Sequence, residues 1–112
     1  MTDKIKIGIF NKTKELGKIL GLDGTLELLN LLDQHPLRYK DLESLLNFSH
    51  ASLLRRLEML QELGIIKKSP IRSNRRETHE YVLTSRGIDL MKFIISYEKE
   101  VNLPIIQRKI TN

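Results

Sequence analysis

The side chains best suited to recognition chemistry lie between residues 49 and 56. Ser49, His50, Ala51 and Ser52 are small or hydrogen-bonding, and Arg55 follows at helical spacing. A helix that enters the major groove of DNA needs such side chains along its first turns. The planar guanidinium of Arg55 matches O6 and N7 of guanine together, a contact that contributes roughly 1–3 kcal/mol of base discrimination. We predict that this helix binds DNA through Ser49, His50, Ala51, Ser52, Arg55 and Arg56.

The same segment also has a simpler interpretation. On a helical wheel its core face carries Leu53, Leu57 and Leu60, so the arginines could belong to the solvated side of an amphipathic helix. Arg56 lies nearer the core face, where it would bind a phosphate or hold the structure together. The exposed face is small and basic at its start and becomes acidic only from Glu58 onward, where a helix would leave the groove. This order favours contact with DNA.

Basic side chains gather again between residues 67 and 80. Five basic residues stand against two acidic ones there, which is +3 of the chain's net +5. Strands are predicted at 65–69 and 79–83, so the polar residues 70–77 between them should form an exposed hairpin loop. An Arg-rich loop suits phosphates or a narrow minor groove, although charges also protect exposed strand edges from aggregation. We predict that the DNA backbone contacts here are made by Lys67, Lys68, Arg72, Asn74, Arg75 and Arg76.

Two further basic residues, Arg38 and Lys40, flank a short segment before the proposed DNA-binding helix. They could contact phosphates, and plain solvation explains them equally well.

The sequence contains no pattern typical of a catalytic or metal site. His35, His50 and His79 lie in separate predicted elements, with no second ligand at helical spacing. No Gly-x-Ser-x-Gly turn, P-loop or dinucleotide-binding glycine pattern is present. The chain has no Cys, which excludes disulfides, thiolate ligands and a Cys nucleophile. We expect no catalysis, no metal and no cofactor.

Periodicity and capping residues predict the elements that position these side chains. Ser49 and Thr84 are natural helix N-caps, and Gly64 is a C-terminal stop. A two-turn helix, a short turn at 47–49 and a longer helix form a helix-turn-helix, followed by a hairpin as its wing. The expected fold is mainly α with a small β-hairpin, a winged helix-turn-helix with extra N- and C-terminal helices. The predicted helices are 11–20, 25–34, 40–46, 50–63 and 85–101, with a small strand at 37–39 and with Leu42, Leu45 and Leu46 facing inward.

Three stretches of the chain resemble HxlR-type transcription regulators. Residues 36–42, PLRYKDL, are similar to the PLRFxEL entry to their helix-turn-helix. Residues 48–66 resemble their ISHxxLxxRLxxLExxGLV recognition helix and first wing strand. Residues 80–87 resemble the xYxLTxxG motif shared by HxlR, PadR and MarR relatives. The resemblance spans about residues 23–95.

This resemblance implies a dimeric prokaryotic regulator that binds double-stranded DNA through residues 49–56 and the wing. It also implies that Gly87 lets the last helix pack close to the wing strands, because glycine has no Cβ. HxlR-type proteins often carry an N-terminal Cys, which this chain lacks, so no redox role is transferred.

Length and composition indicate one domain over residues 1–112. We expect an N-terminal arm and helix at 1–22, a winged-helix core at 23–84 and a C-terminal helix at 85–112. Residues 4–9 alternate like a strand, either as an arm exchanged between protomers or as an irregular start. No apolar run approaches the ~18 residues that span a bilayer, and signal-peptide features are missing. A cytoplasmic, nucleoid-associated protein with no membrane partner is expected.

The C-terminal helix carries more apolar side chains than a lone helix should expose. Pairing two copies would bury them and set two DNA half-sites about one helical turn, ~34 Å, apart. The alternative is that this helix folds back on its own domain. The predicted dimer interface comprises Ile88, Met91, Ile94, Ile95, Val101 and Leu103.

Together these patterns favour a homodimeric, sequence-specific regulator that binds double-stranded DNA without an obligatory small molecule. Two alternatives remain: a winged helix used as a protein-interaction module in a transcription or replication assembly, and a non-specific architectural DNA binder. A protein-binding surface would more often be apolar or acidic where this chain has Arg55 and the basic hairpin.

Overall fold

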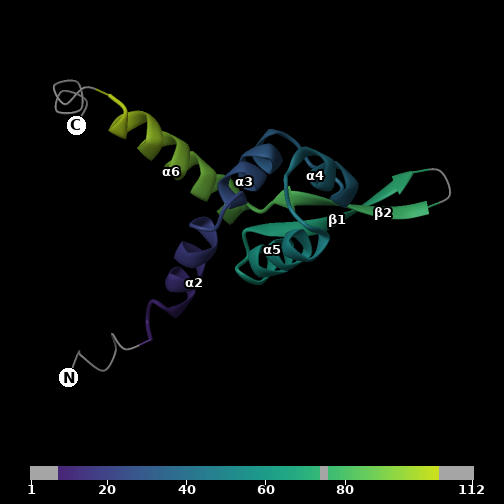
Figure 1. Ribbon diagram of the computed structural model, residues 1–112, viewed down its shortest axis with the longest axis horizontal. Coiled ribbons are helices and arrows are strands. Elements are labelled where there is room, and N and C mark those ends of the chain that lie inside the picture. The colour runs from purple at the N-terminus through teal and green to yellow at the C-terminus, as the bar shows by residue number, and fades with distance from the viewer. Residues whose placement is uncertain (1–7, 74–75, 104–112) are drawn as a thin grey trace.

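The computed structural model describes residues 8–73 and 76–103, without the side chains of residues 72–77 (Figure 1). The expected winged helix-turn-helix is confirmed in this part of the chain. The expected small strand at 37–39 is only a single bridge, in which Leu37 and Tyr81 exchange both backbone hydrogen bonds. The elements are α2 (Asn11–Leu20), α3 (Thr25–Gln34), α4 (Tyr39–Leu45), α5 (His50–Glu62), β1 (Ile66–Ser73), β2 (Arg76–Leu83) and α6 (Ser85–Val101).

One buried cluster of aliphatic side chains joins the helices to the base of the hairpin. The predicted core face of α5 is confirmed, because Leu53, Leu57 and Leu60 are all fully buried. Leu42 of α4 is also fully buried, but the inward orientation expected for Leu45 is wrong, since its side chain is largely exposed. The backbone turns to an extended conformation after α4 ends at Leu45. The fully buried hydrophobic members of the core are Ile19, Leu28, Leu29, Leu42, Leu53, Leu57, Leu60, Ile65 and Ile66.

The ends of α5 and α6 are capped by the residues expected from the sequence. The Ser49 hydroxyl accepts a hydrogen bond from the Ser52 backbone N–H at 3.2 Å. Gly64 follows α5 with a left-handed φ of 73°, which glycine adopts without strain. The Thr84 hydroxyl accepts from the Gly87 N–H at 3.0 Å and lies 2.6 Å from the Gly64 carbonyl, to which it donates. Thr84 therefore caps α6 and ties its start to the turn after α5.

The hairpin is longer than the sequence predicted. β1 and β2 pair antiparallel from Ile66 opposite Leu83 to Ser73 opposite Arg76. The expected loop at 70–77 is therefore wrong in extent, because most of these residues lie in the strands. A two-stranded ribbon that extends beyond the core has solvent on both faces, so its residues need no apolar alternation to pair. The two residues between the strands, Asn74 and Arg75, lie outside the described residues.

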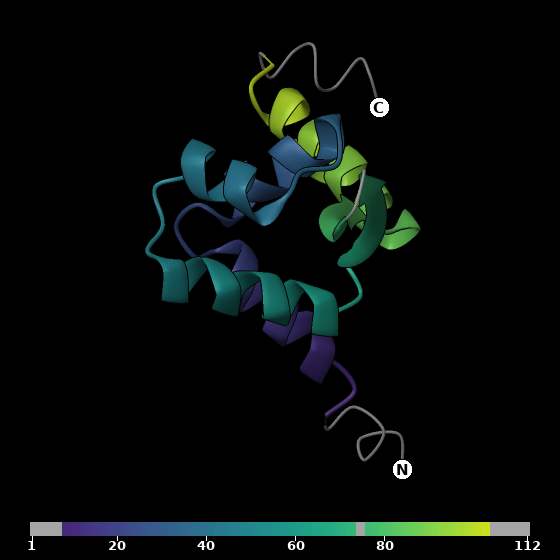
Figure 2. The ribbon, with the colours of Figure 1, turned by 90° about the vertical axis from the view of Figure 1, so that its right-hand side faces the viewer.

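The hairpin and the outer ends of α2 and α6 extend to opposite sides of the molecule (Figure 1). Figure 2 shows α5 along one side, with α4 and the connecting turn at its N-terminal end and β1 after its C-terminal end. The arm proposed for residues 4–9 falls almost wholly outside the described residues. Within residues 8–73 and 76–103, no helix is long and apolar enough to cross a membrane.

Candidate nucleic-acid interface

The N-terminal half of α5 presents an uncovered face to solvent. Ser49, His50, Ala51, Ser52 and Arg55 are all exposed, as the sequence predicted. In the described part of the chain, no hydrogen bond or ion pair engages the Arg55 guanidinium. A cation with no internal partner on an exposed helix face is available to an external anion or base edge.

A three-residue polar cluster links α4 to the start of α5. The Tyr39 hydroxyl oxygen lies 2.5 Å from Nδ1 of His50, and the two rings meet edge to face at 5.3 Å between centroids. A Glu43 carboxylate oxygen lies 3.7 Å from the same nitrogen. Desolvation raises the pKa of the Tyr39 hydroxyl, and the nearby Glu43 carboxylate and Tyr81 raise it further, so the phenol keeps its proton at neutral pH. The sequence analysis did not identify Tyr39, because only the fold brings it to His50.

Arg56 points away from the exposed face and binds within the protein. Its Nη1 donates to the Asp23 carbonyl at 2.8 Å and to the Thr25 hydroxyl at 2.6 Å. The guanidinium lies 4.8 Å from the centroid of the Phe48 ring. Burial lowers the pKa of Arg56 and the nearby Asp23 opposes that shift. Of its two expected roles, Arg56 therefore takes the structural one, and we leave it out of the proposed DNA contacts.

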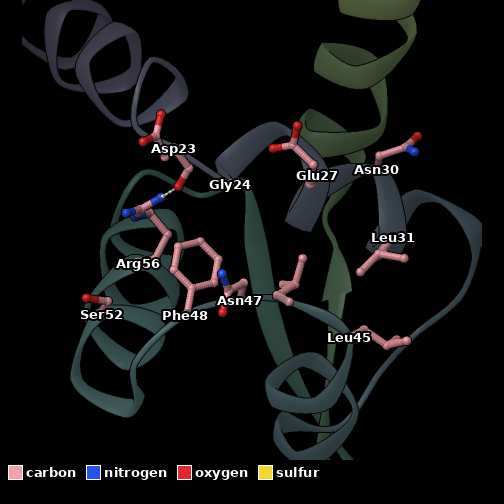
Figure 3. A pocket seen from close by; sticks show the side chains of 11 residues that line it. Asp23, Gly24, Glu27, Asn30, Leu31, Leu45, Asn47, Phe48, Ser52 and Arg56 are labelled. Atoms are coloured by element: carbon pink, nitrogen blue, oxygen red, sulfur yellow. Dashed lines mark hydrogen bonds between the residues drawn. The ribbon is translucent and has the colours of Figure 1, made fainter.

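An open cleft of about 810 Å³ lies between α3, the end of α4 and α5 (Figure 3). Phe48 and Arg56 stand on its α5 side, and Asp23 and Glu27 place carboxylates at its α3 side. Leu31 and Leu45 contribute apolar surface. No sequence pattern indicated this cleft, because its walls come from segments that meet only in the fold.

The flanking basic residues surround the base of the hairpin. Tyr81 of β2 pairs with Leu37 on one side and with Lys68 of β1 on the other, which brings Arg38 beside the wing. The ammonium of Lys68 lies 5.8 Å from the centroid of the Tyr81 ring. The structure shows four of the predicted basic contacts as exposed side chains, Arg38, Lys40, Lys67 and Lys68. The side chains of Arg72, Asn74, Arg75 and Arg76 lie outside the described residues.

The C-terminal helix has a different exposed face from the one predicted. Met91 is only 2% exposed and belongs to the core of its own domain, so its assignment to a dimer interface is wrong. Ile94 and Ile95 are half-buried against that core. Ile88, Val101 and Leu103 are exposed as expected.

The sequence analysis missed the two largest exposed hydrophobic side chains of α6. Phe93 is 68% exposed and Tyr97 is 60% exposed, and their rings stack one helical turn apart with centroids 6.4 Å from each other. Their i, i+4 spacing places both rings on one face of a helix, and this spacing could have identified them from the sequence. The uncovered apolar side of α6 is thus mainly aromatic.

Residues 8–73 and 76–103 contain no group of three or more His, Cys, Asp or Glu side chains that could hold a metal ion.

The structure has a helix-turn-helix followed by a basic hairpin, and a comparison with protein families identifies the same motif. The family described as HxlR-like helix-turn-helix matches residues 23–107. The chain belongs to this family. It is therefore a DNA-binding transcription regulator of the HxlR-like type, as the resemblance in its sequence implied. A comparison with curated protein sequences returned no match.

Solved structures with the same fold support the winged-helix assignment for this HxlR-like protein. A MarR-family transcriptional regulator from Porphyromonas gingivalis W83 has a TM-score of 0.64 at 24% identity, covering 81% of this chain and 91% of that one. The reduced form of the regulator YodB from B. subtilis has a TM-score of 0.67 at 21% identity, covering 79% and 86%. A transcriptional regulator homologue from Pyrococcus horikoshii OT3 has a TM-score of 0.64 at 21% identity, covering 81% and 93%.

Proposed function

We propose that this HxlR-like protein binds double-stranded DNA sequence-specifically as a homodimer, with α5 in the major groove and the hairpin on the backbone. The observation that carries the proposal is the exposed N-terminal half of α5, where Arg55 has no partner in the described part of the chain. A guanidinium in this position can bond O6 and N7 of one guanine. The small Ala51 and Ser52 let the helix approach the base edges closely.

Contacts with the DNA backbone supply most of the affinity in this proposal. Exposed lysines on β1 and exposed cations at the start of α4 lie on either side of Tyr81, so they gather at the base of the hairpin, where they can contact phosphates. Such contacts position the protein without reading sequence. The proposed backbone contacts are Arg38, Lys40, Lys67, Lys68, Arg72, Asn74, Arg75 and Arg76.

Dimerisation is proposed through α6. Its exposed side chains include two stacked aromatic rings, and apolar area of this kind is commonly buried between subunits. The proposed interface consists of Ile88, Phe93, Tyr97, Val101 and Leu103. In this arrangement residues 23–84 form the DNA-binding unit of a single domain, and the segments before and after it serve assembly.

The proposed role requires no catalysis, cofactor or obligatory small molecule, and it places the protein on DNA in the cytoplasm. An alternative role in protein interaction would not need exposed lysines on β1, nor an exposed Arg55 that has no partner among the described residues.

The test is selection of duplexes from a random library, followed by fluorescence anisotropy at several salt concentrations. We expect enrichment of a two-fold symmetric site. Arg55→Ala should reduce the difference in affinity between that site and scrambled DNA by roughly 5- to 150-fold, the equivalent of 1–3 kcal/mol. Arg55→Lys, which keeps the charge, should lose most of the same discrimination because it lacks the planar fork.

Three other results would contradict the proposal. Salt-sensitive binding without an enriched site would indicate an architectural binder. No binding at low salt would indicate a protein-interaction module. Equal loss on specific and scrambled DNA in Arg55→Ala would remove Arg55 as the base-reading residue.

A further inference from the structure

His50 stands at the start of α5 with one ring nitrogen held by the protein and the other free for a ligand. Its side chain is 67% exposed, yet Nδ1 lies 2.5 Å from the Tyr39 hydroxyl. No described residue bonds to Nε2. The ring is thus oriented by α4 and presented at the end of α5 that enters the groove.

The heavy-atom positions fit either direction of this hydrogen bond, and we assign the phenol as the donor when the imidazole is neutral. The other acceptor within reach of the Tyr39 O–H is the His50 main-chain carbonyl at 3.4 Å, which is beyond the usual length of such a bond. The lone pair of an imidazole nitrogen is an effective acceptor, and a phenol O–H is a stronger acid than a neutral imidazole N–H. In neutral histidine one nitrogen accepts and the other carries the proton, so Nε2 carries it here.

Protonation of His50 leaves the outward nitrogen unchanged. Both nitrogens of the cation carry protons, so Nδ1–H would then donate to the Tyr39 oxygen, with the Glu43 carboxylate 3.7 Å away. In either charge state Nε2 is a hydrogen-bond donor. The contact with Tyr39 excludes the neutral Nδ1–H tautomer, in which Nε2 would carry a lone pair and accept a hydrogen bond.

We propose that Tyr39 is a positioning residue that makes His50 a donor-only reader of the DNA major groove. Guanine offers two acceptors there, adenine and thymine offer one each, and cytosine offers only the N4 donor. His50 therefore rejects cytosine and favours guanine at one position of each half-site. This inference rests on the proposed function, because it assumes that α5 enters the major groove.

The first test measures the tautomer directly, on the full-length protein without DNA. Nitrogen-15 spectra of the histidine side chains should show neutral His50 in the Nε2–H form. His35 is an internal reference for the opposite form, because its Nδ1 lies 3.1 Å from the Pro36 carbonyl, which can only accept. Tyr39→Phe keeps the ring contact but removes the hydroxyl, so it should give a mixture of forms for His50 and leave His35 unchanged. His50 in the Nδ1–H form, or no effect of Tyr39→Phe, would overturn the inference.

The second test uses the enriched duplex with each base placed in turn at every half-site position. The wild-type protein should bind about fivefold more weakly when cytosine occupies one particular position, the loss of one hydrogen bond. Tyr39→Phe and His50→Ala should both reduce that penalty at the same position and leave the salt dependence unchanged. Ser44→Ala, which removes an exposed hydroxyl of α4 that donates only to the Lys40 carbonyl of its own helix, should retain the penalty.

The outcomes separate the two proposals. If no site is enriched with the wild-type protein, the proposed function fails and the base-reading role of His50 fails with it. If a site is enriched but Tyr39→Phe retains the full cytosine penalty, only the role of Tyr39 is overturned.

Discussion

Gly87, in the first turn of α6, lies directly against the carbonyl oxygen of Ile65. A Cβ on this glycine would overlap that oxygen and crowd the Leu83 side chain. The same carbonyl accepts a hydrogen bond from the Thr84 N–H at 3.0 Å. The start of α6 is therefore held backbone to backbone against the turn before β1. The close packing of Gly87 that the resemblance implied is confirmed, and it fixes the direction in which α6 leaves the winged helix.

Gly87→Ala is expected to destabilise the fold by about 2–3 kcal/mol, because the oxygen it meets is part of a hydrogen-bonded backbone and cannot move freely. The midpoint of thermal unfolding should fall by roughly 10–20 °C, as followed by circular dichroism. Gly17→Ala is the matched control, since Gly17 lies within α2 and a Cβ there would meet nothing within 4 Å. That change should stabilise the protein by up to about 1 kcal/mol. Equal midpoints for the two variants would contradict this account of Gly87.

The neighbouring arginines Arg55 and Arg56 should separate binding from stability. Arg56→Ala leaves the buried Thr25 hydroxyl without its donor and uncovers the Phe48 ring, so we expect a loss of about 2–3 kcal/mol in urea unfolding. Arg55→Ala should change stability by less than about 0.5 kcal/mol, because Arg55 is exposed and unpaired in the described structure.

A double-mutant cycle identifies the contact responsible. Thr25→Val removes the acceptor while keeping most of the shape of the side chain. The coupling between Arg56→Ala and Thr25→Val should be about 1 kcal/mol or more. Purely additive effects would mean that Arg56 stabilises the fold only through its other contacts.

Local signals were sufficient to predict the helices of this protein. The apolar periodicity of α2, α3 and α6 and the caps at Ser49 and Thr84 depend on neighbours in the sequence. The predicted bounds of α2, α3 and α6 match the structure, whereas α4 begins and ends one residue earlier than predicted and α5 ends one residue earlier. The hairpin length was not predictable in the same way. The outer part of the hairpin is paired through backbone hydrogen bonds and has no buried face. Its side chains therefore do not alternate between apolar and polar, which is the pattern that predicts a strand.

The candidate site was predictable only where exposure follows from the helical wheel. The exposed face of α5 and the basic hairpin could be identified, because charge and periodicity are properties of the sequence. The contact between Tyr39 and His50 and the contact between Arg56 and Thr25 join residues that lie 11 and 31 positions apart. Met91 was misassigned for a related reason, because periodicity gives the apolar face of α6 but not which part of it packs on its own domain.

The hairpin cations should determine the salt dependence of DNA binding. With about four of the seven proposed cations of each protomer neutralising phosphates, log K should fall with log salt at a slope near −7 for the dimer. Arg75→Ala combined with Arg76→Ala removes about four contacts per dimer, so the slope should fall to near −4 while specific and scrambled duplexes lose affinity alike. Lys14→Ala combined with Lys18→Ala is the charge-matched control, because these exposed lysines lie on α2, away from the hairpin. A slope that responds equally to both double variants would mean that net charge, and not the wing, sets the salt dependence.

The exposed aromatic pair on α6 should control the oligomeric state. Phe93→Asp places a charge at the centre of the proposed interface, where burying it without a partner is costly, so light scattering should show a monomer at concentrations where the wild type is a dimer. Phe93 is 68% exposed in the single chain, so the substitution should not weaken the fold of the monomer. The melting temperature should therefore fall only by the amount that dimerisation adds to the stability of the wild type. Met91→Ala, two residues earlier, is the contrasting variant: Met91 is buried in its own core, so this change should cost about 2–5 kcal/mol of folding stability and leave the molecular mass of the folded protein unchanged. A Phe93→Asp protein that remains a dimer would place the interface elsewhere than on this face of α6.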